Sequence, residues 1–244
     1  MKSLAIAFCL LMSFCFTVVA QDSTGYLRTS QYINAIDQLT MGTNMVYNFT
    51  TTANTVGTPY LYDGWAYMWL DSLDNKPVQK SVIYEANLDL QKNQLIIKGG
   101  NGKAFAPEIY NVQALHFKKG DEMRFFVRAY LNGSMKFVEQ LSSTGKYTLL
   151  KDVAILYSKA DYVDKGMIQT GKLYNEFRRK YTYYLVQNDK ATKVVLKRKN
   201  ILAAFDNDPQ AAETAKKFMI ANNGFDEVVL AQAVNAINME TTTK

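Results

Sequence analysis

The alternation of apolar and polar positions predicts a β-hairpin over residues 122–140. Its first half has an apolar residue at every second position, which is the period of a strand. The dipeptide Asn132-Gly133 follows, and it tolerates the positive φ angles of a two-residue type I′ turn. Such a turn fixes three cross-strand pairs: Leu131 with Ser134, Arg128 with Phe137, and Phe126 with Glu139. Glu139 then lies diagonal to Arg124 and Arg128, so this register predicts a cluster of opposite charges on one face.

Shorter apolar runs bounded by polar turn residues predict the other strands. These runs are 65–70, 88–90, 95–97, 112–117, 147–157, 181–186 and 192–195. Short polar segments at 91–93 and at 187–190 each separate two of the runs, which predicts two further hairpins. Hairpins that follow one another in the sequence favour an antiparallel sheet over β–α–β units.

The last part of the chain changes to a helical period after Asn200. Asp208 is a suitable N-cap, Pro209 is a suitable first helical residue, and Gly224 can end the helix. A second helix is predicted over residues 226–237. The predicted fold class is therefore mainly β (α+β): an antiparallel sheet, either a sandwich or a partly closed barrel, with a C-terminal helical pair packed on it.

The N-terminus has the layout of a secretory signal peptide, which we assign to residues 1–20. Lys2 supplies a positive charge, an almost uncharged apolar run follows, and Val18-Val19-Ala20 offers the small residues at which a signal peptidase cuts. The apolar run is too short for a comfortable bilayer span, so no transmembrane segment is predicted. Cleavage removes Cys9 and Cys15, which leaves the mature chain without a thiol for a disulfide, a nucleophile or a metal site.

Changes of composition divide the rest of the chain into three segments. Residues 21–58 are rich in Thr, Asn, Ser and Gly, and this segment is predicted to be a loosely ordered leader. Residues 59–196 carry the strand pattern and form the predicted antiparallel β domain. Residues 197–240 carry the helical pattern and form the predicted C-terminal helices.

The reactive side chains give little support for catalysis. His116 is the only histidine and lies in an apolar strand, so a zinc site lacks a second imidazole and, after cleavage, a thiolate. The glycine-rich segment 99–103 lacks the spacing of a P-loop and is predicted to be a turn. We therefore predict no catalytic residue, no metal and no cofactor. Two carboxylates far apart in the sequence could still meet in a hydrolase site, so a carboxylate-only hydrolase stays open as an alternative.

The formal net charge of +6 over 244 residues is modest. Such a charge favours solubility and weak attraction to anionic surfaces, and it is not the dense basic patch of a nucleic-acid-binding protein. We therefore expect the partner to be a protein or a component of the cell envelope, and not a nucleic acid.

A cluster of aromatic residues is the feature that suggests contact with a ligand. The cluster comprises Tyr60, Tyr62, Trp65, Tyr67 and Trp69. These side chains either fill the core of a sheet that has no disulfides or form a surface that stacks on a carbohydrate or a lipid. The candidate binding residues are Tyr60, Tyr62, Trp65 and Trp69. Full burial of both tryptophans would exclude the binding interpretation.

One segment also resembles a motif of known proteins. Gly57-Thr58-Pro59-Tyr60-Leu61-Tyr62-Asp63-Gly64-Trp65 is similar to the Gly-Ser-Pro-Tyr-Leu…acid…Trp motif that opens a group of uncharacterised exported proteins of Bacteroidota-type bacteria. Residues 80–98 are similar to the paired strands of that group, and residues 182–202 to its C-terminal hairpin and the start of its helices. The resemblance spans residues 57–240. It implies export from a Gram-negative cell and, because the group has no established activity, it transfers no catalytic residue.

The functional prediction combines export with a β scaffold that lacks catalytic groups. We expect a non-catalytic β module in the periplasm or at the surface of a Gram-negative bacterium, which binds a protein partner or an envelope component. A calycin-like carrier of a small molecule is an alternative, and it requires a barrel with an apolar interior.

Overall fold

The computed structural model describes residues 49, 53–78, 81–99, 102–107, 111–164, 166, 169–224 and 226–242. The predicted signal peptide, residues 1–20, lies outside the described residues, and so does most of the predicted leader. The end of that leader contributes to the sheet, because Thr55 and Val56 form a short strand, β1, that pairs with a strand near the C-terminus.

Twelve of the described strands form one sheet. They are β1 (Thr55–Val56), β2 (Ala66–Leu73), β3 (Lys76–Pro77), β4 (Tyr84–Asp89), β5 (Gln94–Lys98), β6 (Ala104–Phe105), β7 (Val112–Lys119), β8 (Glu122–Leu131), β9 (Ser134–Gln140), β10 (Thr148–Ser158), β13 (Asn175–Gln187) and β14 (Lys190–Val194). The spatial order is β1-β13-β10-β9-β8-β7-β2-β4-β5-β6, with β14 paired to β13 and β3 paired to β2. Apart from the parallel pair β1–β13, neighbouring strands are antiparallel. The predicted fold class is confirmed, and the sheet is open because β1 and β6 end it on opposite sides.

The hairpin over residues 122–140 has the predicted register. Strands β8 and β9 pair Leu131 with Ser134, Arg128 with Phe137, and Phe126 with Glu139. Asn132 and Gly133 have φ angles of 52° and 82°, as a type I′ turn requires. The local turn chemistry therefore sets the alignment of both strands, and with it the face on which Glu139 lies.

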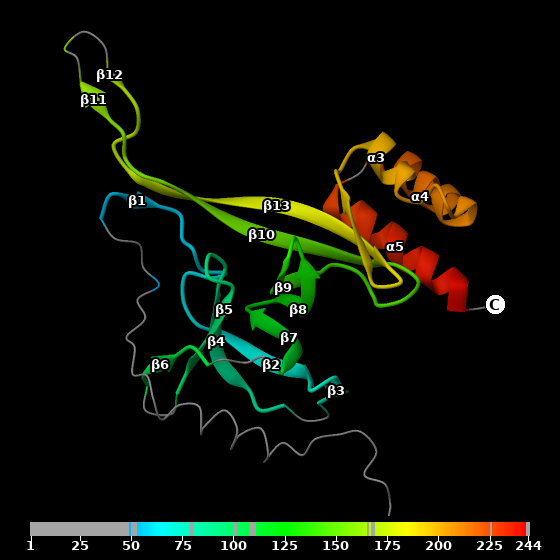
Figure 1. Cartoon of the computed structure of the whole chain (residues 1–244), viewed down its shortest axis with the longest axis horizontal. Helices are drawn as coiled ribbons and strands as arrows, with labels where there is room; N and C mark the ends of the chain where they lie inside the picture. Colours follow the sequence, from blue (N-terminus) through cyan, green and yellow to red (C-terminus); the bar gives the residue numbers. More distant parts are fainter. Residues whose placement is uncertain are drawn as a thin grey trace, which may run out of the picture.

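The longest strand pair is β10 with β13, in which all eleven residues of β10 take part. The apolar run 181–186 predicts only the second half of β13, because the first half contains the charged sequence Arg178-Arg179-Lys180. Beyond this pair the chain continues into the small hairpin of β11 (Val163–Asp164) and β12 (Gln169–Thr170). We call the pair β10–β13 together with the hairpin β11–β12 the ribbon. Figure 1 shows that the ribbon projects as an arm at one end of the molecule, whereas the helices lie at the other end.

Three described helices follow the sheet: α3 (Arg198–Ala203), α4 (Pro209–Ala221) and α5 (Glu227–Thr242). Helix α4 begins as predicted, since Asp208 Oδ1 accepts a hydrogen bond from the Ala211 N–H at 3.3 Å. It ends at Ala221, before the predicted terminator Gly224, and Asn223 takes the left-handed φ of 55°. Helices α4 and α5 pack against each other, which confirms the C-terminal helical pair. None of the described helices combines the length and the apolar character needed to cross a bilayer.

Helix α5 is fixed to the loop between β9 and β10 by the buried side chain of Asn238. Its Oδ1 accepts a hydrogen bond from the Tyr147 N–H at 3.0 Å, and its Nδ2 donates to the carbonyls of Ser143 and Tyr147 at 3.1 and 2.8 Å. Gly145 leaves room for this contact, because a Cβ there would lie 2.5 Å from Asn238 Cγ. The amide therefore satisfies three backbone groups of a loop that would otherwise be buried without partners.

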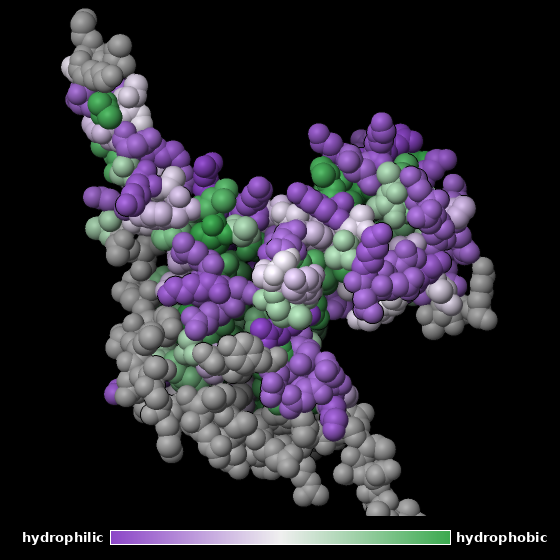
Figure 2. Space-filling view, in the orientation of Figure 1, coloured by the Kyte–Doolittle hydropathy of each residue, from purple (hydrophilic) through white to green (hydrophobic). Residues whose placement is uncertain are grey.

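The apolar core has two main parts. The first lies on one face of β2, β4, β5, β7 and β8, and its largest fully buried members are Met68, Leu88, Leu95, Ile97, Leu115, Phe117 and Phe126. The second lies between the helices and the strands β10, β13 and β14, and includes Leu149, Leu185, Val194, Ile201 and Phe205. In Figure 2 the helices present mostly hydrophilic residues to solvent, and hydrophobic residues gather where the ribbon meets the rest of the sheet. Strands β9 and β10 connect the two parts, since Phe137 of β9 belongs to the first core and Leu149 of β10 to the second.

Candidate functional site

The structure places the four candidate aromatic residues in three different surroundings. Tyr62 is buried in the first core, where burial raises the pKa of its hydroxyl to about 12. Tyr60 and Trp65 both pack edge-on against the ring of Phe49, with centroids 4.9 and 4.7 Å away. Trp69 lies on the face of β2 opposite to the first core and is partly exposed. Because Trp65 and Trp69 both keep partial exposure, the binding interpretation is not excluded, and Trp69 is the candidate that joins an exposed surface.

That surface, which we call the aromatic face, is formed by β2, β7 and β8. Its members are Tyr67, Trp69, His116, Met123 and Phe125. They point away from the first core because side chains alternate between the two faces of a strand. Strand pairing places His116 between Trp69 and Phe125. The rings of Trp69 and His116 are parallel within 7° at a centroid distance of 4.9 Å, and Phe125 lies against His116 at 5.5 Å.

The rim of the aromatic face is open to solvent. Tyr67, Met123 and Phe125 expose 58%, 48% and 47% of their surface. Lys118 stands between Tyr67 and Met123 in the strand register, so a cation borders the apolar side chains. An exposed group of large apolar residues on a continuous sheet is characteristic of a contact surface.

Asp71 follows Trp69 by two positions in β2 and therefore lies on the same face. The pairing of β2 with β7 shifts between Leu70 and Ser72, so Asp71 is the additional residue of a β-bulge. Asp71 Oδ1 lies at hydrogen-bond distance, 2.7 Å, from His116 Nδ1. Burial raises the pKa of the Asp71 carboxyl, and the neighbouring His116 offsets part of that rise. The pair therefore fixes the orientation of the imidazole and places one polar group beside the rings.

The imidazole of His116 is enclosed by its neighbours. Aromatic rings lie on both sides of the imidazole, and its side chain is 18% exposed. Nucleophilic catalysis requires a base within hydrogen-bond reach of a nucleophile. Among the described side chains, the hydrogen bonds of His116 involve Asp71 and no hydroxyl or amine nucleophile.

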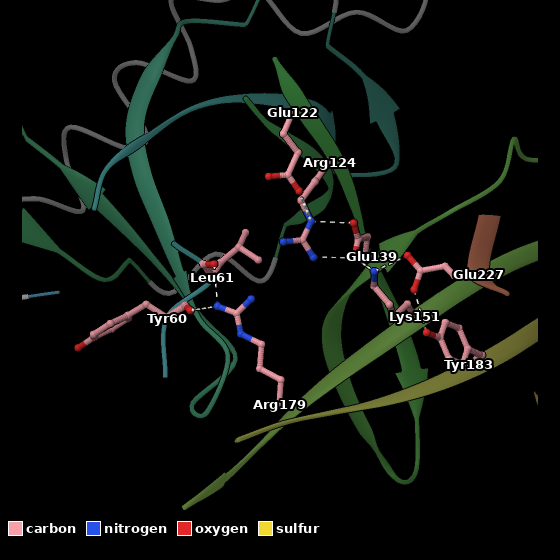
Figure 3. Close-up of polar contacts among 9 residues, drawn as sticks. All are labelled: Tyr60, Leu61, Glu122, Arg124, Glu139, Lys151, Arg179, Tyr183 and Glu227. Atoms are coloured by element: carbon pink, nitrogen blue, oxygen red, sulfur yellow. Dashed lines mark hydrogen bonds and ion pairs between the residues drawn. The ribbon is translucent and has the colours of Figure 1, made fainter. Parts of the chain in front are cut away.

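A second polar arrangement is a chain of charges at the junction between the two cores (Figure 3). Arg124 of β8 donates two hydrogen bonds of 2.7 Å to Glu139 of β9, which confirms this half of the predicted cross-strand cluster. Lys151 of β10 lies 2.8 Å from Glu139 and 2.8 Å from Glu227 of α5. The side chains of Arg124, Glu139 and Lys151 are 13%, 8% and 10% exposed, so these charges are largely excluded from water.

Tyr183 extends this charge chain to β13, and Arg179 and Arg128 make separate contacts. The Tyr183 hydroxyl of β13 donates to Glu227 at 2.8 Å. Arg179, further along β13, donates to the backbone carbonyls of Tyr60 and Leu61 at 2.8 and 2.9 Å. Arg128, the other predicted partner of Glu139, instead holds its guanidinium 5.4 Å from the ring centroid of Phe137. The charge chain therefore connects β8, β9, β10, β13 and α5.

The carboxylates of this chain bear on the hydrolase alternative. Burial favours the neutral form of Glu139, but the hydrogen bonds and charges of Arg124 and Lys151 outweigh it and hold the pKa of Glu139 below its ordinary value of 4.5. A carboxylate hydrolase needs one acid with a raised pKa next to an accessible substrate site. Glu139 instead has a lowered pKa and is a buried carboxylate held between the two cations Arg124 and Lys151.

A cavity of about 380 Å³ lies between β9, β10 and the turn that joins β4 to β5. Residues 90–93, 134–137 and 152–155 line it. Asn93 Oδ1 accepts a hydrogen bond from the Phe137 N–H at 2.9 Å, and Lys136 is paired with Asp152 at 2.5 Å. The cavity is bounded by strand edges of an open sheet, so it differs from the enclosed apolar interior that the carrier hypothesis requires.

The sequence alone did not identify His116 and Phe125 as neighbours of Trp69. Both residues lie in predicted strands, but the pairing of β2 with β7 joins parts of the chain that are separated by β3 to β6; Asp71 and His116 are 45 positions apart. The available signal was the alternation of β8, which directs Phe125 away from the buried Phe126.

The described part of the chain has no group of three or more His, Cys, Asp or Glu side chains arranged to hold a metal ion. The aromatic face offers one imidazole and one carboxylate. Comparisons with protein-family models, with curated proteins and with solved structures found no match to this chain.

Proposed function

We propose that this protein is an exported, non-catalytic module that binds a partner protein of the cell envelope through the aromatic face. The observation that carries the proposal is the row of rings from Trp69, which stacks on His116, to Phe125, which is tilted by 36° against His116; exposed Tyr67 and Met123 border this row. Aromatic residues and methionine are enriched in the buried centres of protein interfaces. Export is supported by the signal-peptide pattern and by the resemblance to the group of exported proteins.

The arrangement of the rings favours a protein over a carbohydrate as the partner. His116 has a ring on each side, and one face of Trp69 is covered by His116. The stacking of His116 on Trp69 therefore removes one flat ring surface from the aromatic face, and Met123 adds an exposed thioether. A sugar ring needs a free flat aromatic face, whereas protein side chains pack well against ring edges and methionine.

The strand scaffold supports a tight contact because it holds these side chains in place before binding. Trp69, His116 and Phe125 are directly opposite one another on three paired strands, and Asp71 fixes the imidazole. Side chains that are already ordered lose little conformational entropy on association. We therefore expect a few of these residues to supply most of the affinity.

The proposal is tested by site-specific photocrosslinking in the source cells. A photoreactive aromatic amino acid replaces Tyr67 or Phe125, and the control position is Ile220, which is exposed on α4 at the far end of the molecule. We expect positions 67 and 125 to give an adduct with the same protein and position 220 to give none. No adduct at either position, or an equal adduct at position 220, would contradict the proposal.

The crosslinked protein is then purified and its affinity is measured. Loss of one hot-spot side chain costs about 2 kcal/mol or more, so we expect the variant Tyr67→Ser with Phe125→Ser to weaken binding by at least about 30-fold. Ile220→Ser serves as the matched control and should bind as the wild type does. If an envelope polysaccharide binds the wild type and not the double variant, the partner is a carbohydrate and the proposed protein partner is wrong.

A further inference from the structure

Strands β9 and β10 are neighbours in the sheet for only a short distance. Among the described residues they pair at Gln140–Leu150 and Glu139–Lys151 and at no other positions. Yet β9 reaches back to Ser134, and β10 continues to Ser158. The turn between β4 and β5 and the cavity of about 380 Å³ lie in the gap where the two strands separate.

The backbone groups of β10 on this side point into the gap. The Leu141 N–H donates to the Leu149 carbonyl at 2.9 Å, and the Leu149 N–H donates to Ser142 Oγ at 2.8 Å. Leu149 therefore directs its backbone groups toward β9, and because directions alternate along an antiparallel strand, the other odd-numbered residues do the same. Beyond Lys151 these residues have no β9 partner in the described structure; they are Val153, Ile155 and Tyr157.

We propose that this edge of β10 binds an extended acidic segment of a partner polypeptide, which pairs with β10 as an added strand. An unpaired strand edge is a template for another chain, and its backbone groups supply the affinity in this mode of recognition. Three outward-facing residues match a bound segment of about five residues. The inference goes beyond the proposed function, since it uses none of the residues of the aromatic face.

The positive charges along this edge of β10 favour an acidic segment as the ligand. Three exposed cations lie along it: Lys92, Lys159 and Lys180. Lys180 belongs to β13 and is directly opposite Ala154 of β10. The carboxylates nearby already have partners, because Asp152 binds Lys136, and Glu176 binds Lys172. The remaining positive charge is complementary to Asp or Glu side chains on the incoming strand.

The two faces of the ribbon also define where apolar side chains of the segment would lie. Val153, Ile155 and Tyr157 share one face with the aromatic rings of Phe177 and Tyr181. Ala154 and Lys180 share the other face. An incoming strand that alternates apolar and acidic residues thus places its apolar side chains beside Ile155. Its carboxylates lie beside Ala154, on the face from which the long side chain of Lys180 reaches across from β13.

The test uses synthetic peptides and the full mature chain. The probe is a fluorescent, N-acetylated peptide of alternating valine and glutamate, six residues long, and its binding is followed by fluorescence anisotropy. One comparison peptide has lysine in place of glutamate, and another has N-methylated valines, which cannot donate backbone hydrogen bonds. We expect the acidic peptide to bind at least about tenfold more tightly than either comparison peptide. Its binding should slow amide hydrogen exchange at Val153, Ile155 and Tyr157.

Two variants keep the proposal open to refutation. Ile155→Pro removes a backbone N–H that points away from β13 and is not used in the pairing with β13. We expect circular dichroism to show that the fold is retained, and peptide binding to fall at least tenfold. The variant Lys92→Glu with Lys180→Glu should reverse the preference and bind the lysine peptide more tightly. Absence of binding by the acidic peptide, or equal binding of both charges, overturns the proposal. Analytical ultracentrifugation provides another test. If the wild type is a dimer and Ile155→Pro is a monomer, the edge of β10 binds a second copy of the chain and the proposal is wrong.

Discussion

The charge chain around Glu139 predicts a large loss of stability when its carboxylate is neutralised. Glu139→Gln keeps the shape of the side chain and leaves two buried cations, Arg124 and Lys151, facing a neutral amide. Breaking a buried ion pair by removing one partner costs about 3–5 kcal/mol. Lys151 keeps Glu227 at 2.8 Å, so we expect a value near the lower end, about 3 kcal/mol.

The loss is measured by urea unfolding followed by circular dichroism, with linear extrapolation to water. The matched control is Glu213→Gln, because Glu213 is exposed on α4 and lies 3.8 Å from Lys216. We expect that control to change the free energy of unfolding by less than about 0.5 kcal/mol. A loss below about 1 kcal/mol for Glu139→Gln, with an unchanged denaturant slope, would refute the idea that these charges hold the two cores together.

The carboxylate of Glu139 also determines how the difference in the free energy of unfolding between the wild type and Glu139→Gln depends on pH. The pKa of Glu139 in the folded protein lies below its ordinary value of 4.5, so the folded state binds fewer protons there than the unfolded state does. The stabilisation is therefore complete above pH 4.5 and is lost as the pH falls through the folded pKa. Unfolding free energies of wild type and Glu139→Gln should converge at acidic pH. A difference that stays constant with pH would contradict this reasoning.

Three further predictions concern the backbone, the helix contact and the N-terminus. Gly57→Ala should destabilise the protein by about 1–3 kcal/mol, because Gly57 has a φ of 78° and an added Cβ would clash with the Phe177 carbonyl. An unchanged melting temperature would contradict this prediction. Asn238→Leu should cost at least about 2 kcal/mol, since it leaves buried backbone groups of the loop before β10 without partners, and the readout is again urea unfolding. The intact mass of the protein isolated from the source cells should correspond to a chain that starts at Gln21, and a chain that retains Met1 would disprove cleavage.

The parts of the fold that could be predicted from the sequence depend on local information. Asn132-Gly133 determines the β8–β9 turn by its backbone preferences, and the turn then determines the position of Glu139. Asp208-Pro209 marks the start of α4 for a similar reason. The first half of β13 could not be predicted, because its charged residues are held in a strand by the ladder with β10 and not by an apolar alternation.

The candidate site could be predicted only in part for a related reason. The aromatic cluster indicated Trp69, but sequence proximity grouped it with Tyr62, whose side chain lies on the opposite face in the first core. The partners of Trp69 come from β7 and β8, and strand pairing over such sequence distances has no local signature. Alternation along β2 places Asp71 on the face of Trp69, but its hydrogen bond with His116 depends on the pairing of β2 with β7.

The contact of Asn238 with the loop at Ser143 and Tyr147 has a consequence for the order of events in biogenesis. The residues that it joins are 91 and 95 positions apart. If the chain is exported with its N-terminus first, as we propose, this contact cannot form until Asn238 has emerged from the membrane. Contacts between residues far apart in the sequence form late, and this slows folding. A chain that has not yet folded can still pass through a translocation channel. Removal of residues 238–242 takes this contact away, and we expect the truncated chain to have a lower free energy of unfolding than the full chain.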